Sequence, residues 1–407
     1  MATAPDDFRW RPILLPAYGP TAMASLGYGA LAPIIALAAS ELGANVATAA
    51  LVVGLTAFGQ LLGDLPAGAI AAKLGERKAL LMASTLDAAS MTVAYFAHSL
   101  LVLAIAVFVD GLAASVFNLA RHAWMTVAIP LRYRARALSS LGGTFRVGLF
   151  FGPFIAAGLI SAFSIHAVFL FAACTGLAAG ALTLTMADLP TPVPVPGSAP
   201  PAKVTVASVI REHRRVLATV GVGVLLISAA RASRQSILPL WSQAQHLDAS
   251  TISVVFGIAS GVELLLVYPG GAVMDRFGRV FVAVPAVALM GVGLGLLPLT
   301  HTALTIALVA CLMAVGNGLS SGIVLTMGSD AAPNVGRSQF LGAWRFLADA
   351  GGLLGPAVVS LVTVIASLAA SAVALAGLCA LGAGWLGAWA PRRRPATTTI
   401  ASGMNKT

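Results

Sequence analysis

Long apolar stretches recur along the whole chain, and they limit its fold more than any other feature. Each has about 20 residues, enough for one helix to cross a ~30 Å hydrocarbon core. Of the 407 residues, 58% are hydrophobic and only 9% are charged, whereas roughly a quarter are charged in a soluble domain. Lipid offers no partner to backbone groups, and the stretches lack the alternating polarity of barrel strands. They must therefore be helices.

We expect twelve membrane-spanning helices, in two groups of six. The predicted spans are 12–38, 47–72, 79–97, 100–129, 137–161, 164–187, 214–241, 250–274, 279–299, 302–328, 338–365 and 367–390. A proline-rich linker at 188–213 separates the bundle at 12–187 from the bundle at 214–390, and segments 1–11 and 391–407 lie outside them. The proline density excludes a continuous helix and favours an extended, solvated linker. The predicted fold is all-α and polytopic.

Positive charges are confined to alternate loops. Lys and Arg residues precede the first span or follow the even-numbered spans, while the other loops carry Glu41, His98, His246, Asp248 and His301. This positive-inside bias predicts that both termini and the linker are cytoplasmic. The net charge of +10 thus follows from topology, and we expect no nucleic-acid partner. The Ala-, Gly- and Arg-rich composition favours a bacterial plasma (inner) membrane.

The two halves repeat each other in sequence. At an offset of 203 residues, "QLLGDLPAGAIAAKLGER" aligns without a gap to "ELLLVYPGGAVMDRFGRV", and the same offset places Gly152-Pro153 on Gly355-Pro356. Two parallel repeats joined by a linker describe a known transporter architecture, in which the substrate site lies between the halves near the bilayer midplane. We therefore expect a central site.

On these motifs, the whole chain resembles the major facilitator superfamily. The signature is a glycine, then Asp-Arg four residues on, then a glycine and basic residues, in the loops after spans 2 and 8. The second-half copy "GAVMDRFGR" supplies Gly271, Asp275, Arg276 and Arg279, and the first-half copy keeps Gly68 and Arg77. Ala72 replaces the acid in the first-half copy.

The resemblance implies a latch between the halves. The glycines let two helices turn and pack closely, and Asp275 is expected at the start of span 5, where the helix dipole favours an anion. Arg276 and Arg279 are expected to anchor the loop at the anionic inner leaflet. Alternatively, Asp275 pairs with one of these arginines on the surface. The matching latch onto span 11 is expected to be weak or absent.

A second motif lies in span 5. "GLFFGP" contains Gly148, Gly152 and Pro153, and it is similar to the antiporter signature of drug-efflux members of the family. Small residues spaced by four let helices approach closely, and the proline bends the helix. The motif recurs in span 11 at Gly351, Gly355 and Pro356. Ordinary helix packing is the alternative interpretation.

Ionisable residues within the spans are candidate functional groups, because a charge in the bilayer core is costly unless it is paired or faces water. They are Asp64, Asp87, Asp110, Arg146, Arg231, Arg234, Glu263, Arg345 and Asp349. Asp110, Asp64 and Glu263 are the proton-coupling candidates; the alternative is that all three are permanently paired. The intramembrane arginine usual in span 4 of the family is replaced by Val107. Arg121, His122 and Asp330 lie near span ends and are expected to reach the interface.

Counting residues from the inner ends of the spans brings two pairs to the same depth. We predict that Asp64–Arg345 and Arg146–Glu263 join the halves, close the cytoplasmic side and part when the protein opens inward. The alternative for Arg345 is Asp349, four residues on along the same helix face.

Polar and aromatic residues within the spans are the substrate-site candidates, and two of them lie in the outer half of span 7. Arg231 and Arg234 share a face of span 7, where they either bind an anionic substrate group or pair with Asp110 or Asp87. The weaker candidates are Asn118, Gln235, Trp241 and Asn317, the last expected to be the span 10 counterpart of Asp110.

The sequence predicts a secondary active transporter, with proton-coupled efflux of small hydrophobic or amphipathic compounds as the leading function. The alternative is a carrier for a specific organic anion that uses Arg231 and Arg234; a membrane sensor would need a signalling domain. No catalytic constellation or Walker loop stands out, so we expect no enzyme activity, cofactor or metal. The expected partners are the lipid bilayer, a small-molecule substrate and protons, and the chain is expected to work as a monomer.

Overall fold

The computed structural model describes residues 11–188, 206–333 and 335–390, and within them the chain folds into helices without strands. The helices of the first half are α1 (Arg11–Leu31), α2 (Ile34–Glu41), α3 (Val46–Leu74), α4 (Glu76–Tyr95), α5 (Leu100–Ala128), α6 (Leu131–Ala162) and α7 (His166–Thr183). Segments 1–10 and 391–407 and most of the linker lie outside the described residues.

The second half begins with helix α8 (Val206–Glu212), which follows the last linker proline. Its other elements are α9 (Arg214–Val216), a π-helical turn η1 (Leu217–Gly221), α10 (Val222–Ala244), α11 (Ala249–Phe277), α12 (Val280–Leu296), a 3₁₀ turn η2 (Leu297–Leu299), α13 (Ala303–Leu319), α14 (Ile323–Ala331), α15 (Arg337–Ile365) and α16 (Leu368–Trp389). The expectation of an extended linker is therefore wrong for residues 206–212, which contain no proline to prevent a helix.

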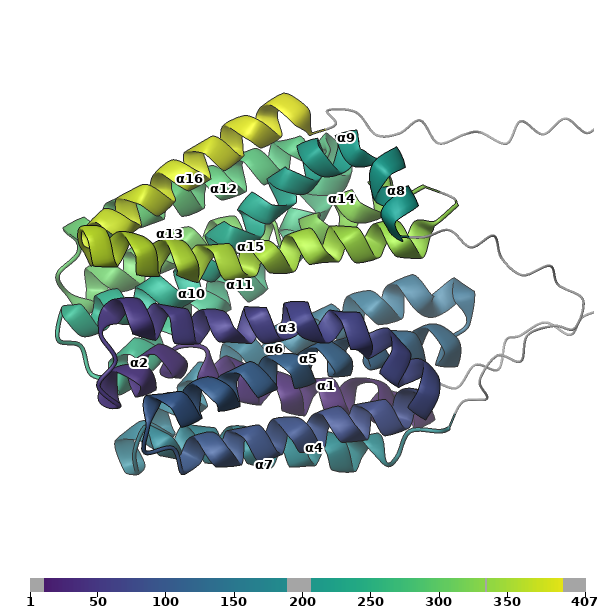
Figure 1. Ribbon diagram of the computed structural model, residues 1–407, viewed down its shortest axis with the longest axis horizontal. Coiled ribbons are helices and arrows are strands. Elements are labelled where there is room, and N and C mark those ends of the chain that lie inside the picture. Colours follow the sequence, from purple (N-terminus) through teal and green to yellow (C-terminus); the bar gives the residue numbers. More distant parts are fainter. Residues whose placement is uncertain (1–10, 189–205, 334, 391–407) are drawn as a thin grey trace, which may run out of the picture.

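The helices form twelve membrane spans in two six-helix bundles (Figure 1). Ten spans are long and apolar enough by themselves, and α1 and α2 make another that bends by 46°. The remaining span is α4, whose apolar character is lowered by Asp87, several Ser and Thr residues and three charged residues in its first turn. The chain is thus an all-helical, multi-span membrane protein.

Helices α3 and α11 show how the repeated sequence sets repeated boundaries. Asn45 and Asp248 each cap a helix by accepting a hydrogen bond from the backbone N–H three residues on, which satisfies an otherwise unpaired donor. At the other ends, Gly75 and Gly278 have φ angles of 79° and 99°, a region that glycine enters without a Cβ penalty. These are the tight turns predicted from the two loop motifs.

The two bundles meet through α3 against α15 and α6 against α11 (Figure 1). A Cβ at Gly54 would lie 3.1 Å from Pro356, and one at Gly257 would lie 2.7 Å from the ring of Phe154. The Ser250 hydroxyl also donates to the backbone carbonyl of Ala157 at 3.1 Å. These contacts close the interface at the end of the molecule opposite the linker.

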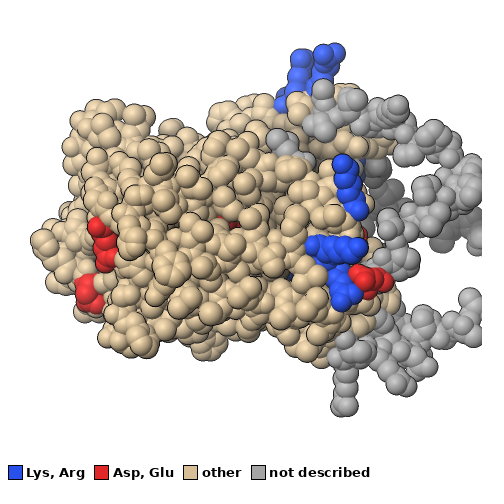
Figure 2. Space-filling model, turned by 60° about the horizontal axis from the view of Figure 1, so that its bottom comes forward, with Lys and Arg blue, Asp and Glu red and all other residues tan. Residues whose placement is uncertain are grey.

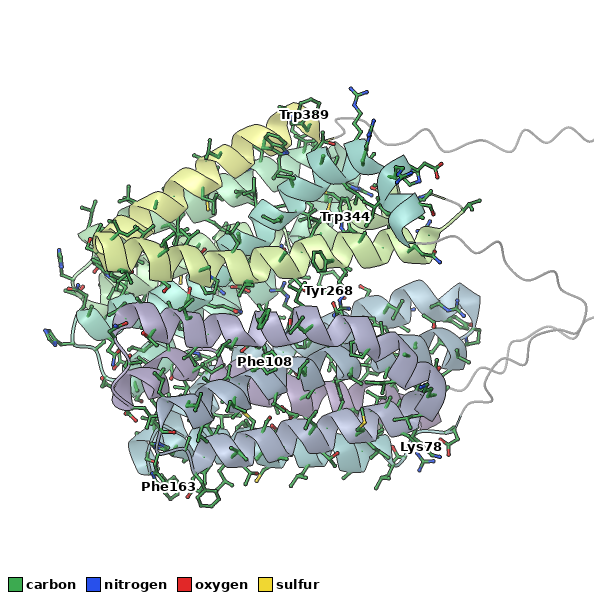
Figure 3. The ribbon with its side chains drawn as sticks, viewed as in Figure 1. Lys78, Phe108, Phe163, Tyr268, Trp344 and Trp389 are labelled. Atoms are coloured by element: carbon green, nitrogen blue, oxygen red, sulfur yellow. The ribbon has the colours of Figure 1, made fainter. Side chains whose placement is uncertain are left out.

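The long outer surface is apolar, and charges gather at the two ends. Large hydrophobic side chains such as Phe163 and Leu265, each 77% exposed, point away from the bundles, and Figure 3 shows Phe163 doing so. In Figure 2, Lys and Arg side chains cluster at the linker end, whereas the charged side chains visible at the opposite end are acidic. An apolar belt between polar ends suits a bilayer-spanning protein.

Candidate functional site

Three adjoining cavities occupy the centre of the molecule. The first, of about 240 Å³, lies among first-half helices and is lined by Asp87, Asp110, Asn118 and Arg121. The second, of about 230 Å³, lies between the halves, and the third, of about 210 Å³, adjoins it. Tyr28 lines all three, Asp110 faces the first and second, and Arg231 faces the second and third. The shared residues make the three cavities one polar region between the bundles.

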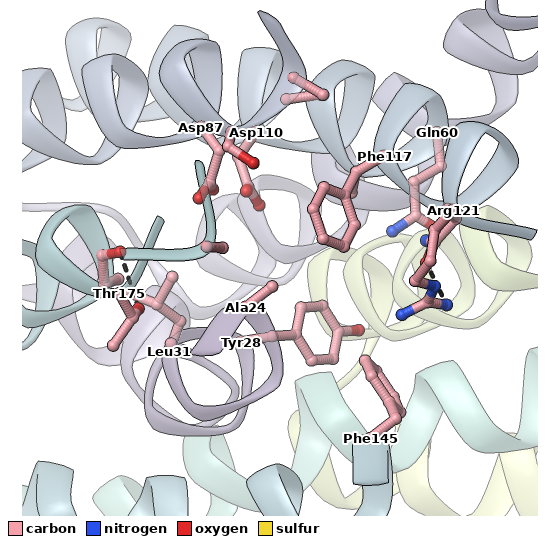
Figure 4. A pocket seen from close by; sticks show the side chains of 18 residues that line it. Ala24, Tyr28, Leu31, Gln60, Asp87, Asp110, Phe117, Arg121, Phe145 and Thr175 are labelled. Atoms are coloured by element: carbon pink, nitrogen blue, oxygen red, sulfur yellow. Dashed lines mark hydrogen bonds between the residues drawn. The ribbon is translucent and has the colours of Figure 1, made fainter. Parts of the chain in front are cut away.

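Two carboxyl groups lie side by side in the first cavity (Figure 4). Asp87 comes from α4 and Asp110 from α5, and both line this cavity. Among the described residues, neither has an ion-pair partner. Two ionised carboxylates this close together in a buried site repel each other, and a proton on one of them removes that repulsion. The pair is therefore a candidate proton site.

Arg121 lies at another part of the same cavity (Figure 4). Its guanidinium donates to Asn118 at 2.9 Å and to Thr21 at 3.3 Å, and it sits 5.7 Å from the ring centre of Phe117. The residue is only 8% exposed, so the expectation that it reaches the interface is wrong. Counting residues to the end of the span missed this, because the side chain turns inward between α1 and α5.

A cluster of three arginines and one glutamate borders the third cavity. Glu263 is 3% exposed. It accepts a hydrogen bond from Arg146 at 2.9 Å and forms a salt bridge with Arg234. Arg231 donates to the backbone carbonyl and the hydroxyl of Ser320. Three cations face one anion, and the Nε and Nη1 atoms of Arg234 have no hydrogen-bond partner. The cluster therefore carries an excess of about two positive charges with unused donors.

Both ion pairs predicted between the halves are present. Besides Arg146–Glu263, Arg345 donates to Asp64 at 2.8 Å. The alternative partner of Arg345 is also engaged, since Asp349 lies 3.5 Å from the same nitrogen. Asp64 accepts a further hydrogen bond from Ser115, so it is a fixed member of a network. The predicted role of the pairs in closing one side of the protein stays a prediction.

Of the two alternatives for the α10 arginines, pairing with Asp110 or Asp87 is not found among the described residues. Arg234 instead pairs with Glu263, and Arg231 with Ser320. Asp110 does face the second cavity together with Arg231, but the two are further apart than the 4.0 Å limit of an ion pair. Opposite charges thus face one cavity from opposite halves without touching.

The loop motif after α11 is held by ion pairs on its own half. Arg279 pairs with Asp330 at 2.9 Å and with Asp275 at 3.5 Å, which is the surface pairing considered from the sequence. Arg276 stacks its guanidinium 5.4 Å from the ring centre of Phe277. The start of span 5 includes side chains outside the described residues, so the latch of Asp275 onto it stays a prediction.

The first-half motif is fixed differently. Arg77 donates to Asp188 and to the backbone carbonyl of Leu184, both at 2.8 Å, and so ties the loop to the end of α7. The expected close packing at the first glycine of each motif is not found. A Cβ at Gly271 would meet open space, and one at Gly68 would only touch Leu119 at 4.0 Å.

The glycines of the span 5 motif pack α6 directly against α1. A Cβ at Gly148 would overlap Ser25, and one at Gly152 would lie 2.5 Å from the backbone nitrogen of Ala30. Their repeat partners Gly351 and Gly355 pack α15 against α10 in the same way. Pro153 lines the third cavity. The motif therefore serves helix packing within each half, and one of its residues borders the site.

Of the remaining predicted substrate-site residues, two line the cavities and one lies outside them. Gln235 lines the second and third cavities and Asn317 the third, and the side-chain oxygen Oδ1 of Asn317 has no hydrogen-bond partner. Trp241 lies outside these three cavities and donates its indole N–H to Thr300 at 3.0 Å. The predicted correspondence of Asn317 to Asp110 is wrong, because the 203-residue offset pairs Asp110 with Met313.

Several lining residues escaped the sequence analysis. Tyr28, Gln60, Phe117 and Phe145 line the first cavity (Figure 4), yet neutral polar and aromatic residues in an apolar span carry no charge to mark them. The repeat held one usable signal, since its offset pairs Tyr28 with Arg231. Among the described residues, no group of three or more His, Cys, Asp or Glu side chains is placed to hold a metal ion.

Comparisons with known proteins agree with this architecture. The sequence profile of the Major Facilitator Superfamily matches residues 21–356. Among solved structures, a POT family transporter in complex with a thioalcohol-conjugated peptide has a TM-score of 0.77 at 11% identity, over 92% of this chain and 94% of that chain. A comparison with curated protein sequences finds no match.

Two further solved structures share the fold. A D-xylose-proton symporter has a TM-score of 0.71 at 13% identity, over 93% of this chain and 98% of that chain. The human organic anion transporter MFSD10 (TETRAN) has a TM-score of 0.67 at 16% identity, over 94% of this chain and 100% of that chain. At such identities the likeness is one of fold.

Proposed function

This chain belongs to the Major Facilitator Superfamily, and from that premise we propose that it is a secondary active transporter that exports a small amphipathic compound in exchange for protons. A transporter of this fold exposes a central site to each side of the membrane in turn. The two halves of one chain enclose that site, so a monomer suffices. The basic residues at the linker end support cytoplasmic termini and an inner-membrane location.

The observation that carries proton coupling is the Asp87–Asp110 pair. It lies inside the membrane-spanning bundle, borders the central cavities and has no described cation to neutralise it. The pair is stable with one shared proton, and a bound cationic group can replace that proton. Loading the substrate and loading the proton are then alternatives, which is the requirement for exchange.

Alternation needs contacts between the halves that can part. The Asp64–Arg345 and Arg146–Glu263 pairs are such contacts, and the second of them lines the third cavity. When the halves rock, each charge needs a new partner. The alternative partners already lie close, since Asp349 is beside Arg345 and Arg234 is beside Glu263.

The outward direction rests on the similarity of "GLFFGP" to the antiporter signature. Tight packing of α6 on α1 at Gly148 and Gly152 favours movement of these helices as one unit, and Pro153, a residue type that favours a bend in a helix, lies at the cavity wall. A rigid helix pair with a bend beside the site suits rocking of a whole half.

Inverted membrane vesicles with a respiration-driven pH gradient test this function. We expect that ethidium, L-phenylalanine or 2-phenylethylamine, added in turn, dissipates the gradient in vesicles that contain the protein. Asp110→Asn and Asp87→Asn should abolish the response, whereas Asp248→Asn, an acid outside the site, should retain it. In cells, an uncoupler should raise accumulation of the same probe. Absence of a response to every probe, or an unchanged response in Asp110→Asn, rules the function out.

The arginine excess at the third cavity favours a second candidate, a carrier for an organic anion. Arg231 and the unpaired nitrogens of Arg234 can together bind a carboxylate, because guanidinium groups recognise carboxylates through paired N–H donors. Competition between benzoate and the transported probe, measured for the wild type and Arg231→Ala, separates the two. An anion carrier loses competition by benzoate in the variant, whereas an exporter of cations shows none in either protein.

A further inference from the structure

We infer that the substrate is a small zwitterion, an amino-carboxylate, held between the acidic wall of the first half and the arginine wall of the second. The inference rests on the proposed function and names the substrate class of the same site. It starts from the second cavity, where Asp110 and Arg231 both line the wall but belong to opposite halves. A single molecule in this cavity contacts both.

The charges on the two walls do not balance by direct contact. On the first-half wall, Asp87 and Asp110 form no ion pair among the described residues, and Arg121 in the same cavity donates to the neutral Asn118 and Thr21 instead of to these acids. On the second-half wall, Arg146, Arg231 and Arg234 face only Glu263, which leaves about two positive charges. Buried charges in a membrane protein need a partner. An ammonium group suits the first wall and a carboxylate suits the second.

The unused hydrogen-bonding capacity points the same way. Arg231 has an unpartnered Nε, and Arg234, which is 6% exposed, has an unpartnered Nε and Nη1. Guanidinium donors left free beside a cavity are satisfied by a carboxylate on the ligand. A purely cationic or purely apolar compound leaves them unsatisfied.

The space between the walls limits the rest of the molecule. The second cavity, which Asp110 and Arg231 both line, measures about 230 Å³. The rings of Tyr28, Phe117 and Phe145 line the first cavity beside the acids (Figure 4). Aromatic faces attract an ammonium group and pack against an apolar side chain. An amino acid or similar amino-carboxylate with an apolar side chain meets these conditions.

Matched probe sets test the inference by binding rather than by transport. Each set contains an amino acid, the amine without its carboxylate and the acid without its amino group. L-phenylalanine, 2-phenylethylamine and 3-phenylpropanoate form one set, and the leucine and alanine analogues form two more. In the purified full-length protein, we expect at least one amino acid to bind at least tenfold more tightly than both of its partners.

Variants on the two walls then separate the two contacts. Arg231→Gln should make the amino acid bind no more tightly than the amine. Asp110→Asn should make the amino acid bind no more tightly than the acid. Arg231→Lys keeps the charge and should retain most of the advantage, and Arg215→Gln, an exposed arginine outside the cavities, should change nothing. If in none of the three sets the amino acid binds at least tenfold more tightly than both the amine and the acid, the inference is overturned. Proton-coupled flux of an amine in the vesicle assay would then still support the proposed function.

Discussion

Helices α3 and α11 begin and end at the same positions of the 203-residue repeat, yet the polar side chains that they place at the centre differ. The offset pairs Gln60 with Glu263, and it pairs Tyr28 on α1 with Arg231 on α10. The caps and glycines that shape the helices are repeated, whereas the residues that line the site are not. A shared scaffold lets the halves move symmetrically, and different charges on equivalent positions make the cavity between them polar.

Glu263 and its counterpart Gln60 give the strongest test of this difference. Glu263→Gln should lower the free energy of unfolding by about 3–5 kcal/mol, because it leaves three arginines without their buried anion. Gln60→Ala should cost less than about 1 kcal/mol, because no buried charge loses its partner. Chemical denaturation in detergent, monitored by intrinsic tryptophan fluorescence, measures both. Equal losses would show that the asymmetry of charge has no part in stability.

The repeated glycines should instead behave alike in the two halves. Gly152→Leu and Gly355→Leu should each destabilise the protein by about 1–3 kcal/mol, because the side chain must enter a backbone contact of 2.5 Å. Gly158→Leu is the matched control within α6, since a Cβ there meets open space. Thermal unfolding in detergent compares the three. A loss at Gly158 as large as that at Gly152 would mean that packing against α1 is not the cause.

The two ion pairs between the halves differ in exposure and therefore in strength. Arg345 and Asp64 are 38% and 19% exposed at their side chains, against 15% and 4% for Arg146 and Glu263. A double-mutant cycle with Asp64→Asn and Arg345→Gln should give a coupling energy of about 1 kcal/mol, since solvent weakens the pair. The charge swap of Asp64→Arg with Arg345→Asp should transport better than either single change. A swap that is no better refutes the pairing as a functional contact.

Most of the scaffold could be predicted from the sequence, because membrane helices are recognised by their length and apolar composition. The repeat, the linker and both ion pairs between the halves follow from offsets and depth along the spans. The direction in which a side chain leaves its helix cannot be predicted from these offsets and depths. Arg121 therefore turned out to be buried, and Arg234 paired with Glu263 instead of an acid of the first half. Two acids, Asp87 and Asp110, line one cavity together, an arrangement that simple pairing of opposite charges does not predict.

The smallest expected effect lies in the helix caps, where the repeat is chemically uneven. Asn45 caps α3 and Asp248 caps α11, and replacing either with alanine should cost about 1 kcal/mol. Only Asp248 titrates. Hydrogen bonds from Thr251 hold the pKa of its carboxyl below the ordinary value of 3.8, so the folded protein binds this proton less readily than the unfolded chain.

The contribution of Asp248 to stability should therefore be complete above pH 3.8 and decrease as the pH falls below it. Asp248→Asn keeps the cap without the charge, so denaturation midpoints of the variant and the wild type should run parallel from pH 7 to pH 5. Below that range, the midpoint of the wild type should fall more steeply. Asn45→Asp should bring the same acid sensitivity to the first half, because Thr48 donates to position 45 as Thr251 does to 248. If its acid sensitivity matches that of the wild type, the two caps are not equivalent.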